Sequence, residues 1–107
     1  MAEWRFLSNH AQALLCIADD PDIRLRDIAA SVGITERAAH RIVDELVEGG
    51  YLSRSRRGRR NHYKVKRHLA LRDPMLRDRK LADLLELFAG SDGRVATKRG
   101  ASEPRRA

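Results

Sequence analysis

The chain has 107 residues, of which 42% are hydrophobic and 5% aromatic, and it carries a formal net charge of +7. This length excludes two independent cores, the single cysteine Cys16 excludes an intramolecular disulfide, and no apolar run approaches the roughly 20 residues of a membrane span. The excess of basic residues is typical of proteins held against a polyanion, either a nucleic acid or an anionic membrane surface, and the alternative is a merely solvated basic surface.

The first predicted helix begins near Ser8 or Asn9, both good N-caps, and ends at residues 19–22, where proline and aspartates favour a turn. The next three residues, 23–25, are expected to form at most a minimal strand. A second helix then runs to about Val32.

Gly33 breaks the second helix, Thr35 caps a third one, and Gly49–Gly50 ends it. Apolar residues at helical spacing predict a core shared by these two helices: Ile28, Ala29, Val32, Ile34, Ala39, Ile42, Val43 and Leu46. The opposite arc of the third helix is polar: Glu36, Arg37, His40, Arg41 and Asp44.

Two strands are expected at residues 51–55 and 60–66, around a turn at residues 57–59. No Asp or Glu occurs from residue 49 to residue 72. The basic residues crowded there are Arg54, Arg56, Arg57, Arg59, Arg60, Lys64, Lys66 and Arg67. Because Tyr63 and Val65 alternate with polar residues, one face of this hairpin can pack inward while the other faces a polyanion.

A last helix is predicted from Asp73–Pro74 to about residue 88 or 89. Its apolar stripe consists of Leu81, Leu84, Leu85 and Phe88. This stripe either closes the core of the monomer or pairs with its copy in a homodimer, and we favour dimerisation. The expected organisation is a helix–hairpin domain over residues 1–72, the amphipathic helix over 73–89 and a disordered basic tail over 90–107.

The segment from residue 25 to residue 65 resembles the winged helix-turn-helix of bacterial transcriptional regulators, closest in style to the MarR-like group. The shared pattern is Asp27-Ile28-Ala29, Val32-Gly33-Ile34-Thr35, Ile42-Val43-Asp44-Glu45-Leu46 and Gly50-Tyr51-Leu52. The resemblance implies a mainly α fold with a small β-hairpin, a recognition helix, a basic wing and a dimer. In two respects the chain departs from that group: the long terminal helices that build a ligand pocket are missing, and Arg24 stands where a capping Ser or Thr is usual.

We therefore expect a sequence-specific regulator that binds double-stranded DNA. The recognition helix, residues 35–48, would enter the major groove, and the wing, residues 54–67, would lie on the backbone or in the minor groove. The expected contacts are Thr35, Glu36, Arg37, His40, Arg41, Arg54, Arg56, Arg57, Arg59, Arg60 and Lys64. Two other functions stay open: a sequence-indifferent binder of DNA or RNA, and a winged-helix adapter that binds proteins.

No nucleophile–base pair, phosphate-cradling glycine loop or paired carboxylate indicates an enzyme. The four histidines are scattered, so we expect no metal and no cofactor, and without a pocket we expect no small-molecule effector. Cys16 is interpreted as a packing thiol, with an intersubunit disulfide as the alternative. The N-terminus lacks a basic-then-apolar signal pattern, which favours the bacterial cytoplasm, at the nucleoid.

Overall fold

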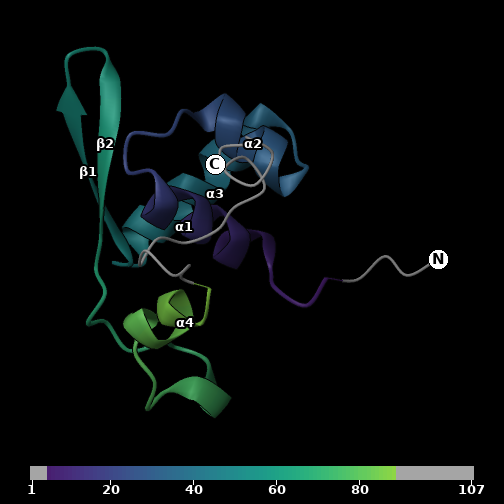
Figure 1. The fold of residues 1–107 in the computed structure, drawn as a ribbon, viewed down its shortest axis with the longest axis vertical. Helices are drawn as coiled ribbons and strands as arrows, with labels where there is room; N and C mark the ends of the chain where they lie inside the picture. The colour runs from purple at the N-terminus through teal and green to yellow at the C-terminus, as the bar shows by residue number, and fades with distance from the viewer. Residues whose placement is uncertain (1–4, 89–107) are drawn as a thin grey trace, which may run out of the picture.

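A computed structural model describes residues 5–88 and shows three helices packed together, a two-stranded hairpin on one side and a short fourth helix below (Figure 1). The elements are α1 (Asn9–Asp19), α2 (Leu25–Val32), α3 (Glu36–Glu48), β1 (Leu52–Arg57), β2 (Arg60–Val65), the 3-10 turn η1 (Pro74–Leu76) and α4 (Leu81–Leu87). The predicted class, mainly α with a small β-hairpin, is confirmed.

The predicted starts of α1 and α3 and the predicted end of α2 are confirmed. The hydroxyl of Ser8 accepts from the backbone N–H of Ala11 at 3.1 Å, and that of Thr35 accepts from Ala38 at 3.0 Å. Between them Gly33, with φ at 86°, ends α2 in the left-handed conformation that glycine adopts without a steric penalty. These local signals therefore set the turn between α2 and α3.

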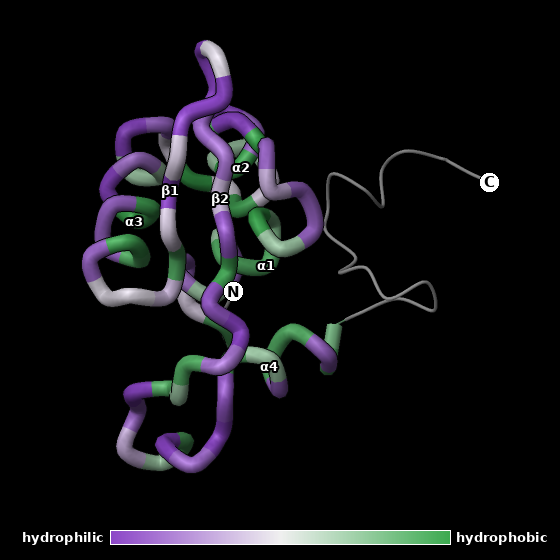
Figure 2. The backbone as a smooth tube through the Cα atoms, turned by 90° about the vertical axis from the view of Figure 1, so that its left-hand side faces the viewer, coloured by the Kyte–Doolittle hydropathy of each residue, from purple (hydrophilic) through white to green (hydrophobic). Residues whose placement is uncertain are grey.

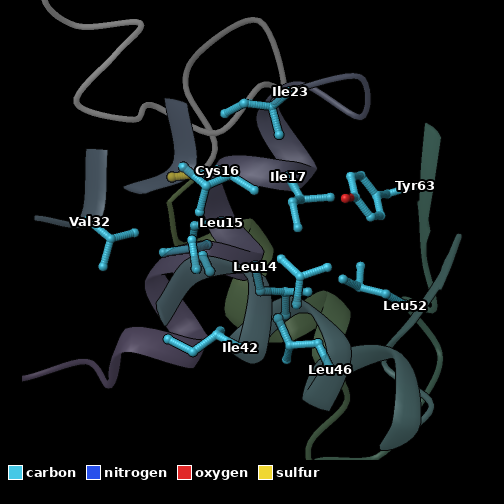
Figure 3. Packing of buried hydrophobic residues seen from close by; sticks show 14 of the residues in the cluster. Leu14, Leu15, Cys16, Ile17, Ile23, Val32, Ile42, Leu46, Leu52 and Tyr63 are labelled. Carbon is cyan, nitrogen blue, oxygen red and sulfur yellow. The ribbon is translucent and has the colours of Figure 1, made fainter. Parts of the chain in front are cut away.

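The core lies where the three helices meet, and Figure 3 shows side chains from all of them converging there. Ile17, Ile28 and Ile42 are at most 1% exposed. Every residue predicted for the shared core of α2 and α3 is buried, apart from Ile34, which is partly buried. Cys16 lies buried on α1, which fits the packing role predicted for it.

The hairpin extends from this core, and its tip is polar. β1 pairs antiparallel with β2 from Leu52↔Val65 to Arg57↔Arg60, and Gly58 has the positive φ, 62°, that a two-residue loop favours. Leu52 and Tyr63 are buried at its base, whereas the hydrophilic colour runs along most of its length in Figure 2. The buried side chains thus anchor the half of the hairpin that lies away from the tip.

The prediction of a minimal strand at residues 23–25 is wrong. Ile23 lies in a loop with its side chain in the core, and its N–H donates to the carbonyl of Asp20 at 3.0 Å. Leu25 already belongs to α2. The carbonyl of Pro21 accepts from the N–H of Tyr63 at 2.9 Å, so the backbone of β2 contacts this loop through one hydrogen bond instead of a ladder.

The predicted start of the last helix at Asp73–Pro74 is also wrong. Residues 74–76 form the single turn η1, and α4 begins at Leu81. Tertiary backbone bonds explain the difference, because Leu71 N–H donates to Arg79 at 2.9 Å and Leu81 N–H donates to Leu69 at 2.8 Å. Those bonds hold the intervening chain as a loop, and the Asp83 carboxylate accepts from the N–H of Lys80 at the new helix start.

The apolar stripe of α4 divides between core and surface. Leu81 and Leu85 are each 1% exposed within the single chain, Leu84 is partly buried, and Phe88 is 38% exposed. α4 therefore closes the monomer core. The tail predicted for residues 90–107 lies outside the described residues.

Candidate nucleic-acid interface

The N-terminal half of α3 presents a polar face to solvent. Glu36, Arg37, His40 and Arg41 are all exposed, and the buried side of α3 fixes the direction in which they point. Within residues 5–88, no hydrogen bond or ion pair engages the side chains of Glu36 or Arg37. Thr35 differs from them, because its hydroxyl is used as the helix cap. Arg37 is therefore available to an external acceptor.

Farther along α3, Asp44 connects the helix to the hairpin. Its carboxylate accepts from Arg54 of β1 at 2.9 Å and lies 3.7 Å from the His40 ring. Arg54 was expected to contact nucleic acid, and in the free protein it is paired with Asp44 instead. Because the pair joins two elements, it orients β1 relative to α3.

Glu45 makes a second connection, on the side of α1. Its carboxylate lies 2.6 Å from His10 Nε2 and 4.0 Å from Arg41 Nε. All three side chains are about half-exposed, so the net stabilisation from these pairs is modest, of the order of 0–1 kcal/mol. Their effect is to restrict the direction of Arg41 on the exposed face.

The predicted basic residues are concentrated on the hairpin, as the sequence indicated. Arg56, Arg57, Arg59 and Lys64 are exposed. Arg56 also donates to the side chain of Asn61 across the strands at 3.4 Å. Like charges held this close repel one another, and a polyanion relieves that repulsion.

The outer part of β2 is clamped to the loop between α1 and α2 at Asp22. His62 Nδ1 donates to the Asp22 carboxylate at 2.7 Å, and Arg60 donates to its backbone carbonyl at 3.1 Å. The hydrogen bond from His62 lowers the pKa of Asp22, against a smaller opposing effect of desolvation, and the charges of His62, Arg57 and Arg60 add to the lowering.

This clamp predicts a pH dependence of stability. Because the pKa of Asp22 is lowered by folding, its contribution is present above the ordinary value of 3.8 and is lost as the pH falls through the folded-state pKa. Urea unfolding should show Asp22→Asn less stable than the wild type at about pH 6, with the difference shrinking below about pH 4. A difference that stayed constant over that range would contradict the role given to the carboxylate.

Sequence reasoning missed two arginines at the start of α2. Arg24 and Arg26 line an open hollow together with Arg59 and Arg60 of the hairpin, and its volume is about 490 Å³. The remaining lining residues are Ile23, Leu25, Glu36, Asn61 and Tyr63. We call it the arginine hollow. The two arginines lie 33 to 36 positions before Arg59 and Arg60 in the chain, so only the fold brings the four together.

A second hollow, of about 440 Å³, lies between α1 and the segment that leads to α4. Its lining is mainly apolar and includes Leu7, Leu14, Leu71 and Leu84. We did not expect a ligand pocket, and this open hollow does not by itself test that prediction. The expectation that no small-molecule effector acts on it stays a prediction.

The described part of the chain holds no group of three or more His, Cys, Asp or Glu side chains placed to bind a metal ion. No helix among residues 5–88 is long and apolar enough to span a membrane.

Comparison with known proteins gives a family match over the three helices α1, α2 and α3. Residues 9–53 match the family model described as winged helix-turn-helix DNA-binding, which confirms the predicted winged helix-turn-helix over those residues. No curated protein sequence matches. Among solved structures, the zinc-dependent MarR family transcriptional regulator AdcR in its Zn(II)-bound state is 19% identical, with a TM-score of 0.44. The alignment covers 62% of this chain and 47% of that one, so the chain spans about half the length of AdcR.

Proposed function

We propose that this chain, which contains a winged helix-turn-helix DNA-binding domain, is a transcription regulator that binds a specific double-stranded DNA site as a homodimer. One observation carries the proposal. The exposed polar face at the start of α3 lies beside a hairpin whose exposed residues are predominantly basic. A helix that presents such a face suits the major groove, and adjacent arginines suit the phosphates.

We assign a role to each side chain according to whether it has a hydrogen-bond or ion-pair partner in the free protein. Arg37 has no partner within residues 5–88 and has the fork geometry that matches guanine O6 and N7. His40 and Arg41 are held at one side by Asp44 and Glu45, which limits the directions they can take. Arg57, Arg59 and Lys64 supply phosphate contacts, and Arg54 supplies one only if it leaves Asp44. The proposal assigns the chain binding and no catalysis.

The homodimer rests on a separate argument. Palindromic sites favour proteins with two-fold symmetry, because two recognition helices then read two half-sites. Leu81 and Leu85 are buried inside the monomer. The apolar residues in and directly after α4 that can still contact a partner subunit are the exposed Leu87 and Phe88 and the partly buried Leu84.

Fluorescence anisotropy tests the proposal with duplexes selected for binding and with random duplexes, across a salt series. We expect a selected site to be bound about 10³-fold or more tightly than random duplex. Equal affinity for both pools with the same steep salt dependence would leave a sequence-indifferent binder. Weak binding of every duplex at physiological salt would favour a protein-interaction adapter.

A further inference from the structure

The arginine hollow is the part of this surface that the recognition helix and the wing do not explain. Arg24 and Arg26 belong to the start of α2, whereas Arg59 and Arg60 belong to the hairpin. Within residues 5–88, the side chains of Arg24, Arg26 and Arg59 make no hydrogen bond or ion pair. Arg60 donates to the backbone carbonyl of Asp22 and forms no direct ion pair within residues 5–88, although its charge also acts on the nearby Asp22 carboxylate.

The position of Arg24 at the start of α2 also favours an anion at this place. It occupies the N-cap position of α2 in an extended conformation, and its side chain makes no capping hydrogen bond. A Ser or Thr at that position would accept from an orphan N–H of the first turn and stabilise the helix. The chain instead places a cation at the positive end of the α2 dipole, which is unfavourable for the isolated helix and favourable for an anion nearby.

We propose that the arginine hollow binds one phosphate of the duplex backbone, held jointly by Arg24 and Arg26 of α2 and by Arg59 and Arg60 of the wing. This inference rests on the proposed function and adds α2 to the DNA contacts. Four guanidinium groups outweigh the single carboxylate of Glu36 at the edge of the hollow. Its volume of about 490 Å³ exceeds that of a phosphate, so the adjoining sugar or water also fits. The phosphate would thereby link the wing to the helix-turn-helix.

The test uses the full chain carrying Arg24→Ser together with Arg26→Gln. The first change supplies a capping hydroxyl and the second keeps a good helix former, so the melting temperature should not fall. We expect binding to every duplex to weaken about threefold to tenfold and the slope of log K against log [salt] to become shallower by about one. Preference between sites should not change. Arg26→Gln alone provides a second, milder variant.

The matched control removes the same charge elsewhere. Arg77→Gln with Arg79→Gln alters two exposed arginines in the segment after η1, at the opposite end of the view from the hairpin tip in Figure 1. It should leave the salt slope within experimental error of the wild type. A control variant that weakened binding as much as the α2 variant would show a general charge effect and would overturn the proposal.

Joint contact with one phosphate also predicts coupling. If Arg24, Arg26 and Arg59 share that phosphate, adding Arg59→Gln to the α2 variant should cost less than it does in the wild type. Strict additivity would place α2 and the wing on different phosphates and contradict the shared site.

Three further outcomes are distinguishable. If the wild type binds a selected duplex and the α2 variant matches it in affinity and slope, the hollow is not a backbone site and the proposed function stands. If calorimetry then shows inorganic pyrophosphate bound by the wild type alone, the hollow serves free phosphate compounds instead. If no duplex binds the wild type, the proposed function itself fails.

Discussion

Replacing Leu85 by alanine will lower the free energy of unfolding by about 2–5 kcal/mol, measured by urea denaturation. Leu85 is 1% exposed and belongs to the same buried cluster as the core of the three-helix bundle. Removing its branched end takes away the transfer free energy of three carbon atoms and leaves a cavity that the surrounding helices fill only in part. The size of this decrease in unfolding free energy measures how much the packing of α4 against the three-helix core stabilises the domain.

The matched control is Leu87→Ala, two residues farther along the same helix and exposed to solvent. Leu87 is 77% exposed, so its loss should change the stability of the monomer by no more than about 0.5 kcal/mol. Urea midpoints at two protein concentrations separate folding from association, because a dimer shifts its midpoint with concentration and a monomer does not. A Leu85→Ala protein with unchanged monomer stability but a lost dimer would restore α4 to a purely dimeric role.

The same measurements separate core residues from interface residues among the four first expected at a dimer interface, Leu81, Leu84, Leu85 and Phe88. We expect Phe88→Ala to reduce association in sedimentation velocity while lowering the unfolding midpoint of the monomer much less than Leu85→Ala does, because Phe88 is 38% exposed and Leu85 is 1% exposed. Leu81→Ala should behave as Leu85→Ala does. If Phe88→Ala and the wild type associate equally, another surface of the chain carries the dimer.

The helix-turn-helix was predictable because its signals are local. A glycine that ends α2 and a threonine that caps α3 lie two residues apart, and each determines the backbone within one turn of its own position. The hairpin was likewise predictable from alternation and from Gly58. The strand ends differ slightly from the prediction, because the ladder continues to the pair Arg57↔Arg60, two residues past the predicted end of the first strand at residue 55.

The segment from residue 70 to residue 80 was not predictable for the opposite reason. Asp73–Pro74 is a good helix start, but the backbone groups of Leu71 and Arg79 find each other instead, and a bridge joins Ala70 to Lys80. Such pairing depends on the tertiary fold. The arginine hollow was missed in the same way, since its arginines come from α2 and from the wing.

The contacts of Asp44 were a third product of the fold. On a helical wheel Asp44 shares the polar arc of Arg37 and His40, and periodicity alone gives it the same solvent-facing role. Its pairing with Arg54 shows that the residues of this polar arc have two different roles. Residues at the start of α3, such as Arg37, stay available to a ligand, whereas Asp44 attaches the wing to the helix.

The second large effect should come from Arg37. On its preferred site we expect Arg37→Ala to weaken binding by about 1–3 kcal/mol and to relax the preference at one base pair, measured by anisotropy competition with single-base variants of the site. The physical reason is that a bidentate pair to one base is lost while other contacts remain. Arg57→Ala on the wing provides the contrast, because it should weaken all duplexes alike and make the salt slope shallower by about one.

Arg37→Lys separates the shape of the side chain from its charge. Lysine keeps the positive charge but lacks the planar fork that donates two hydrogen bonds to guanine. If Arg37 reads a base, Arg37→Lys should lose preference at the same base pair as Arg37→Ala and still keep the wild-type salt slope. If Arg37 only contacts phosphate, lysine should restore most of the affinity for every duplex and the base preference should never have changed. The first result would establish that α3 recognises the base sequence through Arg37. The second would show that residues other than Arg37 determine the sequence specificity.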